Sequence, residues 1–181
     1  MDRNLALELA DTLVHDGNGG VADELADPAA RDAWLAAHLP GARVAVADLR
    51  ALRGPVRALL ARAVTGPPSS ADAAGSLPTV DAAVAAVNAA AARVPVVPVL
   101  TWGEEPVVAL STPDGDGLAA VARSLLAFLA GPDRARLRAC PAPRCVRYFL
   151  KGHNRQNFCK AACGNRARVA RHYEKQRAAT G

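Results

Sequence analysis

The amino-acid sequence predicts an α+β protein: a mostly helical N-terminal domain with a small β-hairpin, followed by a C-terminal module built around four cysteines. Apolar residues recur at intervals of three or four over most of the first 130 residues, which is the spacing of a buried helix face. Two β-branched runs near residue 100 interrupt this pattern and predict the hairpin. All four cysteines lie after residue 139, so their chemistry belongs to the last part of the chain.

The first two helices are predicted from leucine spacing and from a capping signal. Leucines at every fourth position predict a helix over 5–15, and the glycine-rich turn at 17–20 would end it. An aspartate followed by a proline supplies the N-cap and the first residue of a helix over 28–37. We expect this second helix to bury Trp34.

The longest predicted helix covers 42–63 and is followed by a loop. Gly54 and Pro55 should kink or divide this helix, because proline lacks the N–H that an α-helix uses. Its predicted buried stripe consists of Leu49, Leu52, Val56, Leu59 and Leu60. Residues 66–78 are rich in glycine, proline and serine without apolar periodicity, which predicts a mobile connection inside the first domain.

An alanine-rich helix and the hairpin come next. Thr79 would be the N-cap of a helix over 79–92, with one face made by Val80, Val84 and Val87. The β-branched runs 96–101 and 106–110 predict the two strands, and their prolines favour edge strands. A further amphipathic helix over 116–130 completes the α+β pattern.

The composition of the chain changes after this helix. Residues 1–130 contain nine arginines and no lysine against fifteen acidic residues, a net charge of −6. Residues 131–181 contain thirteen arginines and lysines against two acidic residues, a net charge of +11. We therefore expect an acidic domain over 1–131 and a basic domain over 132–181. A basic terminal module indicates a polyanionic partner.

The sequence contains no catalytic signature, and it shows no phosphate-binding glycine motif, zinc-protease motif or nucleophile elbow. We therefore expect a protein that is not an enzyme. The uncharged stretches are shorter than the roughly 18 apolar residues that cross a bilayer. The first residues do not resemble a secretory leader, so we expect a cytoplasmic, nucleoid-associated protein.

The cysteines form two close pairs with the spacing C-x4-C-x13-C-x3-C. Each pair can supply half of a tetrahedral site, and zinc is the metal that four thiolates bind most commonly. A thiol switch or an iron–sulfur cluster is the alternative. Four protein ligands leave no open position for water, so one zinc ion would be structural. The expected ligands are Cys140, Cys145, Cys159 and Cys163.

A basic helix is predicted over 159–177, beginning at the second cysteine pair. Together with a cysteine knuckle and a short hairpin it would form a treble-clef-like finger, whose small core would contain at least three of Tyr148, Phe149, Phe158 and Tyr173. Guanidinium groups suit phosphate oxygens and guanine edges. The candidate nucleic-acid contacts are Arg166, Arg168, Arg171, Lys175 and Arg177.

The run Cys-Gly-Asn-Arg at 163–166, with three cysteines before it and the basic segment 167–172 after it, resembles the CGNR zinc-finger family of bacterial proteins. The segments 5–13, 34–35 and 49–53 are similar to the family's N-terminal domain, called ABATE. Members are regarded as stress-associated transcription regulators. The resemblance implies zinc ligation by the four cysteines, a DNA-binding finger, and a role for Gly164, Asn165 and Arg166.

The sequence departs from the family pattern at three places. Asp11 stands where the pattern has asparagine, and Phe158 stands where tryptophan usually precedes the third cysteine. Residues 150–153 replace an acidic, serine-containing turn, so the tip of the finger could contact its target differently.

We interpret the chain as a transcription regulator that binds duplex DNA through a structural zinc finger and a basic helix. An RNA-binding or ribosome-associated zinc module is one alternative, because charge and zinc do not distinguish the two nucleic acids. A ligand-binding or enzymatic protein whose finger only mediates assembly is another. For the N-terminal domain, sensing of a small-molecule effector and formation of a homodimer both stay open.

Overall fold

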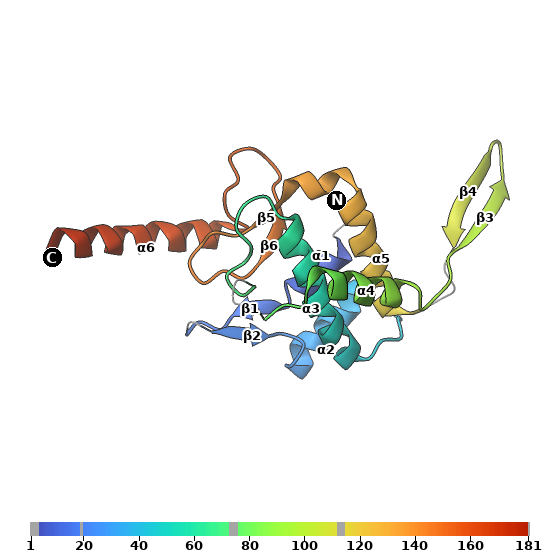
Figure 1. The fold of residues 1–181 in the computed structure, drawn as a ribbon, viewed down its shortest axis with the longest axis horizontal. Helices are drawn as coiled ribbons and strands as arrows, with labels where there is room; N and C mark the ends of the chain where they lie inside the picture. The colour runs from blue at the N-terminus through green and yellow to red at the C-terminus, as the bar shows by residue number, and fades with distance from the viewer. Residues whose placement is uncertain (1–3, 19, 73–75, 112–114, 181) are drawn as a thin grey trace.

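The computed structural model describes residues 4–18, 20–72, 76–111 and 115–180. These residues form six α-helices, one 3-10 helix and three two-stranded antiparallel sheets. Most of the helices gather in the middle of the molecule, and the hairpin β3–β4 and the helix α6 extend from its opposite ends (Figure 1). Within the described ranges, no helix has the length and apolar character needed to span a membrane.

Four helices make the central bundle: α1 (Leu5–Ala10), α3 (Val46–Ala63), α4 (Val80–Ala91) and α5 (Gly117–Ala130). They pack on one another, with α3 and α5 each contacting α1 and α4. The buried stripe predicted for α3 is confirmed at all five positions. The core of the bundle includes Leu9, Leu49, Val56, Leu60, Val87, Val121 and Leu125.

Local capping signals explain where several helices begin. Helix α2 (Pro28–His38) starts as predicted, because the Asp27 carboxylate accepts a hydrogen bond from the Ala30 N–H. Thr79 caps α4 in the same way, and Asp116 accepts two backbone N–H bonds at the start of α5. Trp34 of α2 is buried as expected.

The prediction of a helix over 5–15 is correct for its first half and wrong for its second half. Helix α1 ends at Ala10, and the chain continues as β1 (Leu13–His15), which pairs with β2 (Val21–Asp23). The Asp16 carboxylate accepts the N–H groups of Asn18 and Gly20 and so stabilises the turn between the strands. A glycine-rich segment that was expected only to end a helix therefore closes a hairpin.

Two details of the middle helices also differ from prediction. Helix α3 begins at Val46 rather than at residue 42 and continues through Pro55 as one helix. Pro55 lacks the N–H that would pair with the Ala51 carbonyl, and Ala51 is an exposed residue. On α4, the buried face is Ala83, Val87 and Ala90, whereas Val80 and Val84 are exposed.

The remaining elements form the hairpin and the finger. The predicted hairpin is confirmed within one residue at each strand end, as β3 (Val97–Trp102) and β4 (Pro106–Ser111). The chain then passes through the 3-10 helix η1 (Pro132–Arg136) to β5 (Leu137–Ala139) and β6 (Tyr148–Leu150). It ends in the long helix α6, which covers Ala161–Thr180.

Candidate metal centre and basic helix

The first cysteine pair lies in the connection between β5 and β6. We call these two strands and their connection, residues 137–150, the knuckle. Cys140 follows β5 directly, and its N–H donates to the Arg147 carbonyl at 3.0 Å. The Cys145 N–H donates to the Ala142 carbonyl, also at 3.0 Å, which closes a tight turn. Arg144 adopts the left-handed conformation in this turn, with φ of 65°. That conformation costs a non-glycine residue about 1–2 kcal/mol, so the rest of the knuckle must hold it in place.

The second pair lies at the start of α6. Cys159 precedes the helix, and Cys163 is in its first turn, where the Cys163 N–H donates to the Lys160 carbonyl at 3.1 Å. Cys159 lies two residues before the helix, four residues from Cys163. The Sγ atoms of this pair are 3.5 Å apart.

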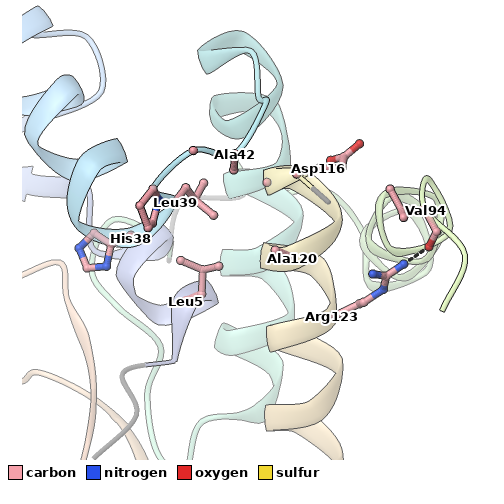
Figure 2. Close-up of a pocket in the computed structure, with 12 residues that line it drawn as sticks. Leu5, His38, Leu39, Ala42, Val94, Asp116, Ala120 and Arg123 are labelled. Carbon is pink, nitrogen blue, oxygen red and sulfur yellow. Dashed lines mark hydrogen bonds between the residues drawn. The ribbon is translucent and has the colours of Figure 1, made fainter. Parts of the chain in front are cut away.

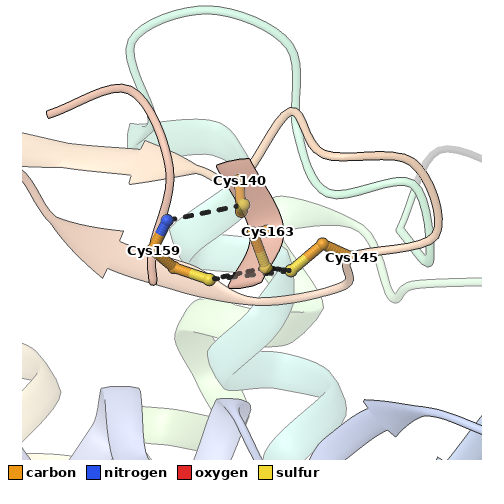
Figure 3. A group of neighbouring side chains, drawn as sticks. All are labelled: Cys140, Cys145, Cys159 and Cys163. Atoms are coloured by element: carbon orange, nitrogen blue, oxygen red, sulfur yellow. Dashed lines mark hydrogen bonds between the residues drawn. The ribbon is translucent and has the colours of Figure 1, made fainter. Parts of the chain in front are cut away.

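The four sulfur atoms converge on one point between the knuckle and the helix (Figure 3). Cys145 Sγ lies 3.8 Å from the Sγ atoms of both Cys159 and Cys163, and all four sulfurs lie within 4.8 Å of one another. These separations exceed the S–S bond of a disulfide, about 2.0 Å. They match the edge of a tetrahedron around zinc, about 3.8 Å for Zn–S bonds of about 2.3 Å. The cluster is consistent with one zinc ion.

The electrostatics of the cluster also favour a cation. The pKa of Cys159 is raised because its thiol donates hydrogen bonds to neighbouring sulfurs and because burial disfavours its charge. The hydrogen bond to Cys140 likewise raises the pKa of Cys145, to about 11, and the hydrogen bonds that Cys140 receives lower its own pKa. A dication is needed to hold all four as thiolates.

The surroundings of the sulfurs are apolar and close-packed. Phe149 and Phe158 pack against the cysteines. A Cβ atom at Gly164 would lie 3.3 Å from Cδ2 of Phe158, so glycine permits the close approach of helix and ring. The prediction that at least three of four aromatic residues lie in this small core is wrong, because Tyr148 is buried in the core of the helical bundle and Tyr173 is 62% exposed on α6.

Two groups around the sulfurs donate hydrogen bonds to them. The Cys159 N–H donates to Cys140 Sγ at 3.5 Å, and Nη2 of Arg166 donates to Cys163 Sγ at the same distance. The guanidinium group of Arg166 is therefore directed at the cluster. Donors of this kind stabilise thiolate ligands and orient them.

The other candidate contacts follow along α6. Arg168, Arg171 and Lys175 line a shallow depression together with His172. Nη2 of Arg168 donates to Asn165 Oδ1, and Nε of Arg171 donates to the Ala167 carbonyl at 3.3 Å. Arg177 is exposed nearer the end of the helix. Arg166 therefore lies at the metal cluster, and the other four lie farther along the exposed helix.

A buried ion pair connects the knuckle to the helical bundle. Arg57 of α3 is 1% exposed and forms two hydrogen bonds with the Asp72 carboxylate, at 2.8 and 2.9 Å. The same guanidinium donates to the Ala10 carbonyl at 2.7 Å and to the Val146 carbonyl at 2.9 Å. Val146 directly follows Cys145. Arg57 thus joins α1, the 66–78 loop and the knuckle.

Tyr148 and Ser69 complete this network. The Tyr148 hydroxyl donates to Asp72 Oδ2 at 2.7 Å, and the Ser69 hydroxyl donates to the Val146 carbonyl at 3.0 Å. Burial and the Asp72 carboxylate raise the pKa of Tyr148 well above its ordinary value. Ser69 and Asp72 belong to the loop predicted to be a mobile connection. Both are buried, whereas the loop residues 66–68, 70 and 76 are exposed, and residues 73–75 lie outside the described residues.

Asp11, which replaces the asparagine of the family pattern, contacts the same segment. Its Oδ1 accepts the Tyr148 N–H at 3.0 Å, a bond that an asparagine carbonyl could also accept. Burial raises the pKa of Asp11 from 3.8 to about 7, although Arg147 nearby acts in the opposite direction. A raised carboxyl pKa contributes stability below pH 3.8 that is lost as the pH rises through about 7.

The sequence reasoning missed this network, although α3 contains a signal for it. Arg53 and Arg57 follow Leu49 at intervals of four, so they occupy the apolar face of the helix. Both are buried, and Arg53 forms a bidentate ion pair with Asp23. Charged residues on a buried face indicate buried partners, but the sequence does not identify them.

Comparisons with known proteins agree with this geometry. The profile of the ABATE family, described as "Putative stress-induced transcription regulator", matches residues 3–132. The profile of the CGNR zinc finger matches residues 136–176, which include the four cysteines, both strands of the knuckle and most of α6. A search of curated proteins finds no match.

Proposed function

The chain belongs to the ABATE family and carries a CGNR zinc finger, and we propose that it is a transcription regulator whose finger binds duplex DNA through α6. The observation that carries this proposal is the exposed row of cations on α6, which begins at the four-cysteine cluster. In this proposal, the basic domain over 132–181 binds DNA, and the acidic domain over 1–131 controls that binding.

The position of α6 suits insertion into a groove. The helix extends away from the bundle (Figure 1). The four-cysteine cluster lies at its first turn. A B-DNA major groove admits an α-helix, whereas the major groove of A-form RNA is too deep and narrow for side chains to read. This difference supports duplex DNA over duplex RNA as the partner.

The residues of α6 have different roles in this proposal. Arg168, Arg171 and Lys175 contact phosphates or base edges, and Arg177 adds a contact farther along the helix. Asn165 orients Arg168 through the hydrogen bond between their side chains. Arg166 positions the start of the helix through Cys163 and places its charge beside the DNA backbone.

Charge reversal on α6 tests the proposal. Arg168→Glu combined with Arg171→Glu is expected to weaken binding to duplex DNA on the order of 100-fold and to lower the log–log salt slope by roughly two, because each lost phosphate contact removes about 0.9. Fluorescence anisotropy with labelled duplex DNA over a salt series measures both quantities. The variant must first be shown to bind zinc and to fold.

The matched control makes the same change of charge away from the finger. Arg43 and Arg62 are exposed residues of the N-terminal part, and reversing both should leave the slope and the affinity nearly unchanged. Equal losses in the two variants would show that net charge, not the α6 face, controls binding. Absence of duplex binding by the parent protein at low salt, or tighter binding to RNA of equal length, would overturn the proposal.

A pocket in the N-terminal part supports control by a small molecule. It has a volume of about 640 Å³ and lies among α1, the end of α2 and α5. Leu5, Leu39 and Ala120 contribute apolar surface, whereas His38 and Arg123 contribute polar groups (Figure 2). Such a lining suits a small, mostly apolar molecule with one polar group.

Trp34 provides a readout for such a ligand, because its ring lies 5.0 Å from the His38 ring. In a Trp102→Phe variant, an effector is expected to change Trp34 emission, raise the melting temperature and alter DNA affinity. Ala120→Leu should reduce all three responses by narrowing the pocket. If fractionated metabolites change neither Trp34 emission nor melting temperature, effector control through this pocket is refuted.

A further inference from the structure

The β3–β4 hairpin presents one wholly apolar face. Its register pairs Leu100 with Val108 and Trp102 with Pro106, and Pro98 lies on the same face because side chains alternate along a strand. Leu100, Val108 and Trp102 are 57%, 65% and 76% exposed. The opposite face consists of Val97, Val99, Thr101, Val107, Ala109 and Ser111, and neither strand contains a charged residue. We define the apolar face as Pro98, Leu100, Trp102, Pro106 and Val108, all of which are exposed.

The rest of the molecule does not cover this face. The hairpin extends beyond α4 and α5, away from the helical bundle (Figure 1). A two-stranded hairpin without further packing is only marginally stable in water. Apolar patches of this kind on a folded protein usually mark an interaction site.

We propose that a second copy of this chain packs its own apolar face against this one, so that two hairpins form a small two-layered sheet about a two-fold axis. An isologous contact requires a self-complementary surface, and the register provides it. An axis at the Leu100–Val108 pair places the large Trp102 ring of each copy over the small Pro98 ring of the other. A bulky side chain thus meets a small one at both ends of the contact.

The charges next to the hairpin are also complementary under this symmetry. Glu104 and Glu105 form the tip beside Trp102, and Arg93 lies before the base of the hairpin. The Arg93 side chain is 49% exposed, although its Nε is paired with Asp116. The two-fold axis brings the acidic tip of one copy toward the half-exposed Arg93 side chain of the other. These opposite charges favour a second copy over an acidic or basic partner of another kind.

This dimer would combine two DNA-binding helices. The hairpin and α6 lie at opposite ends of the molecule, so joining two hairpins leaves both α6 helices at the outside (Figure 1). Dimeric regulators bind two half-sites related by the symmetry of the protein. The self-association itself needs no DNA, so its test is independent of the proposed function.

The test uses the full zinc-loaded chain. Sedimentation velocity over a concentration series is expected to show a monomer–dimer equilibrium. Leu100→Lys combined with Val108→Lys should weaken the dimer by about tenfold or more, because association would move each charged lysine from water into an apolar interface. Thr101→Lys on the opposite face is the matched control and should leave the dissociation constant within about twofold.

Trp102 supplies a second measurement. In a Trp34→Phe variant it is the only tryptophan, and its emission should shift to shorter wavelength and resist iodide quenching as concentration rises. A parent chain that stays monomeric at high micromolar concentration would overturn the proposal. An equal loss of association in the Thr101→Lys variant would also overturn the proposal. So would a blue shift of Trp102 emission that occurs only when lipid vesicles are added.

Discussion

Cys163→Ser is expected to remove the zinc ion and to unfold most of the finger. Cys163 is 1% exposed, and among the described residues the apolar cluster around it contains only the four cysteines, Ala142, Phe149 and Phe158. A cluster of this size cannot offset the entropy of ordering the finger, and structural zinc supplies an apparent binding free energy of about 10–16 kcal/mol in small fingers. Zinc content by mass spectrometry and hydrogen exchange measure the two effects.

The loss of exchange protection should be uneven. Protection is expected to vanish in α6, which depends on its first turn being held at the cluster. It should persist in part at Leu137 and Tyr148, because both are buried in the core of the helical bundle. Cys159→His is the matched control, since a Cys3His set also binds zinc. A Cys163→Ser protein that keeps a protected α6 without zinc would contradict the assignment of a structural metal centre.

Arg57→Ala is expected to lower the free energy of unfolding by about 3–5 kcal/mol, which is the usual cost of breaking a buried ion pair from one side. The substitution leaves the Asp72 carboxylate buried without its cation, and it leaves the carbonyl groups of Ala10 and Val146 without this donor. Equilibrium unfolding in urea gives the magnitude. Proteolysis or hydrogen exchange at the knuckle should also show that the finger is less firmly attached.

Arg50→Ala is the matched control for this prediction. Arg50 lies on the same helix and pairs with Asp23, but its side chain is half exposed. Exposed ion pairs contribute about 0–1 kcal/mol, so this variant should be nearly as stable as the parent. A similar small loss in both variants would show that the Arg57 network does not stabilise the attachment of the finger.

The elements that could be predicted depend on neighbours in the sequence. Asp27 and Thr79 cap their helices through backbone groups three residues away, and the Leu49–Leu60 stripe follows from helical periodicity. The cysteine spacing similarly predicts a site whose two halves each form within one turn. The helix over 5–15 was overextended because the Asp16 turn competes with helical spacing after Ala10.

Burial of particular side chains could not be predicted in this way. Val80 and Val84 have the helical spacing expected of a core face, but α3 and α5 pack against the side of α4 that carries Ala83 and Val87. The 66–78 loop lacks apolar periodicity, yet Ser69 and Asp72 are buried. Their burial depends on Arg57 and Tyr148, which are distant in sequence.

The sequence by itself determined the helical segments, the hairpin, the four cysteines and the basic helix, because periodicity, capping and ligand spacing act over a few residues. Only the tertiary structure decided that Arg57, Asp72 and Tyr148 meet beside the knuckle, and that the apolar face of the hairpin stays uncovered by the bundle. The physical reason is that burial and ion pairing depend on how distant elements pack, and local spacing does not specify that packing.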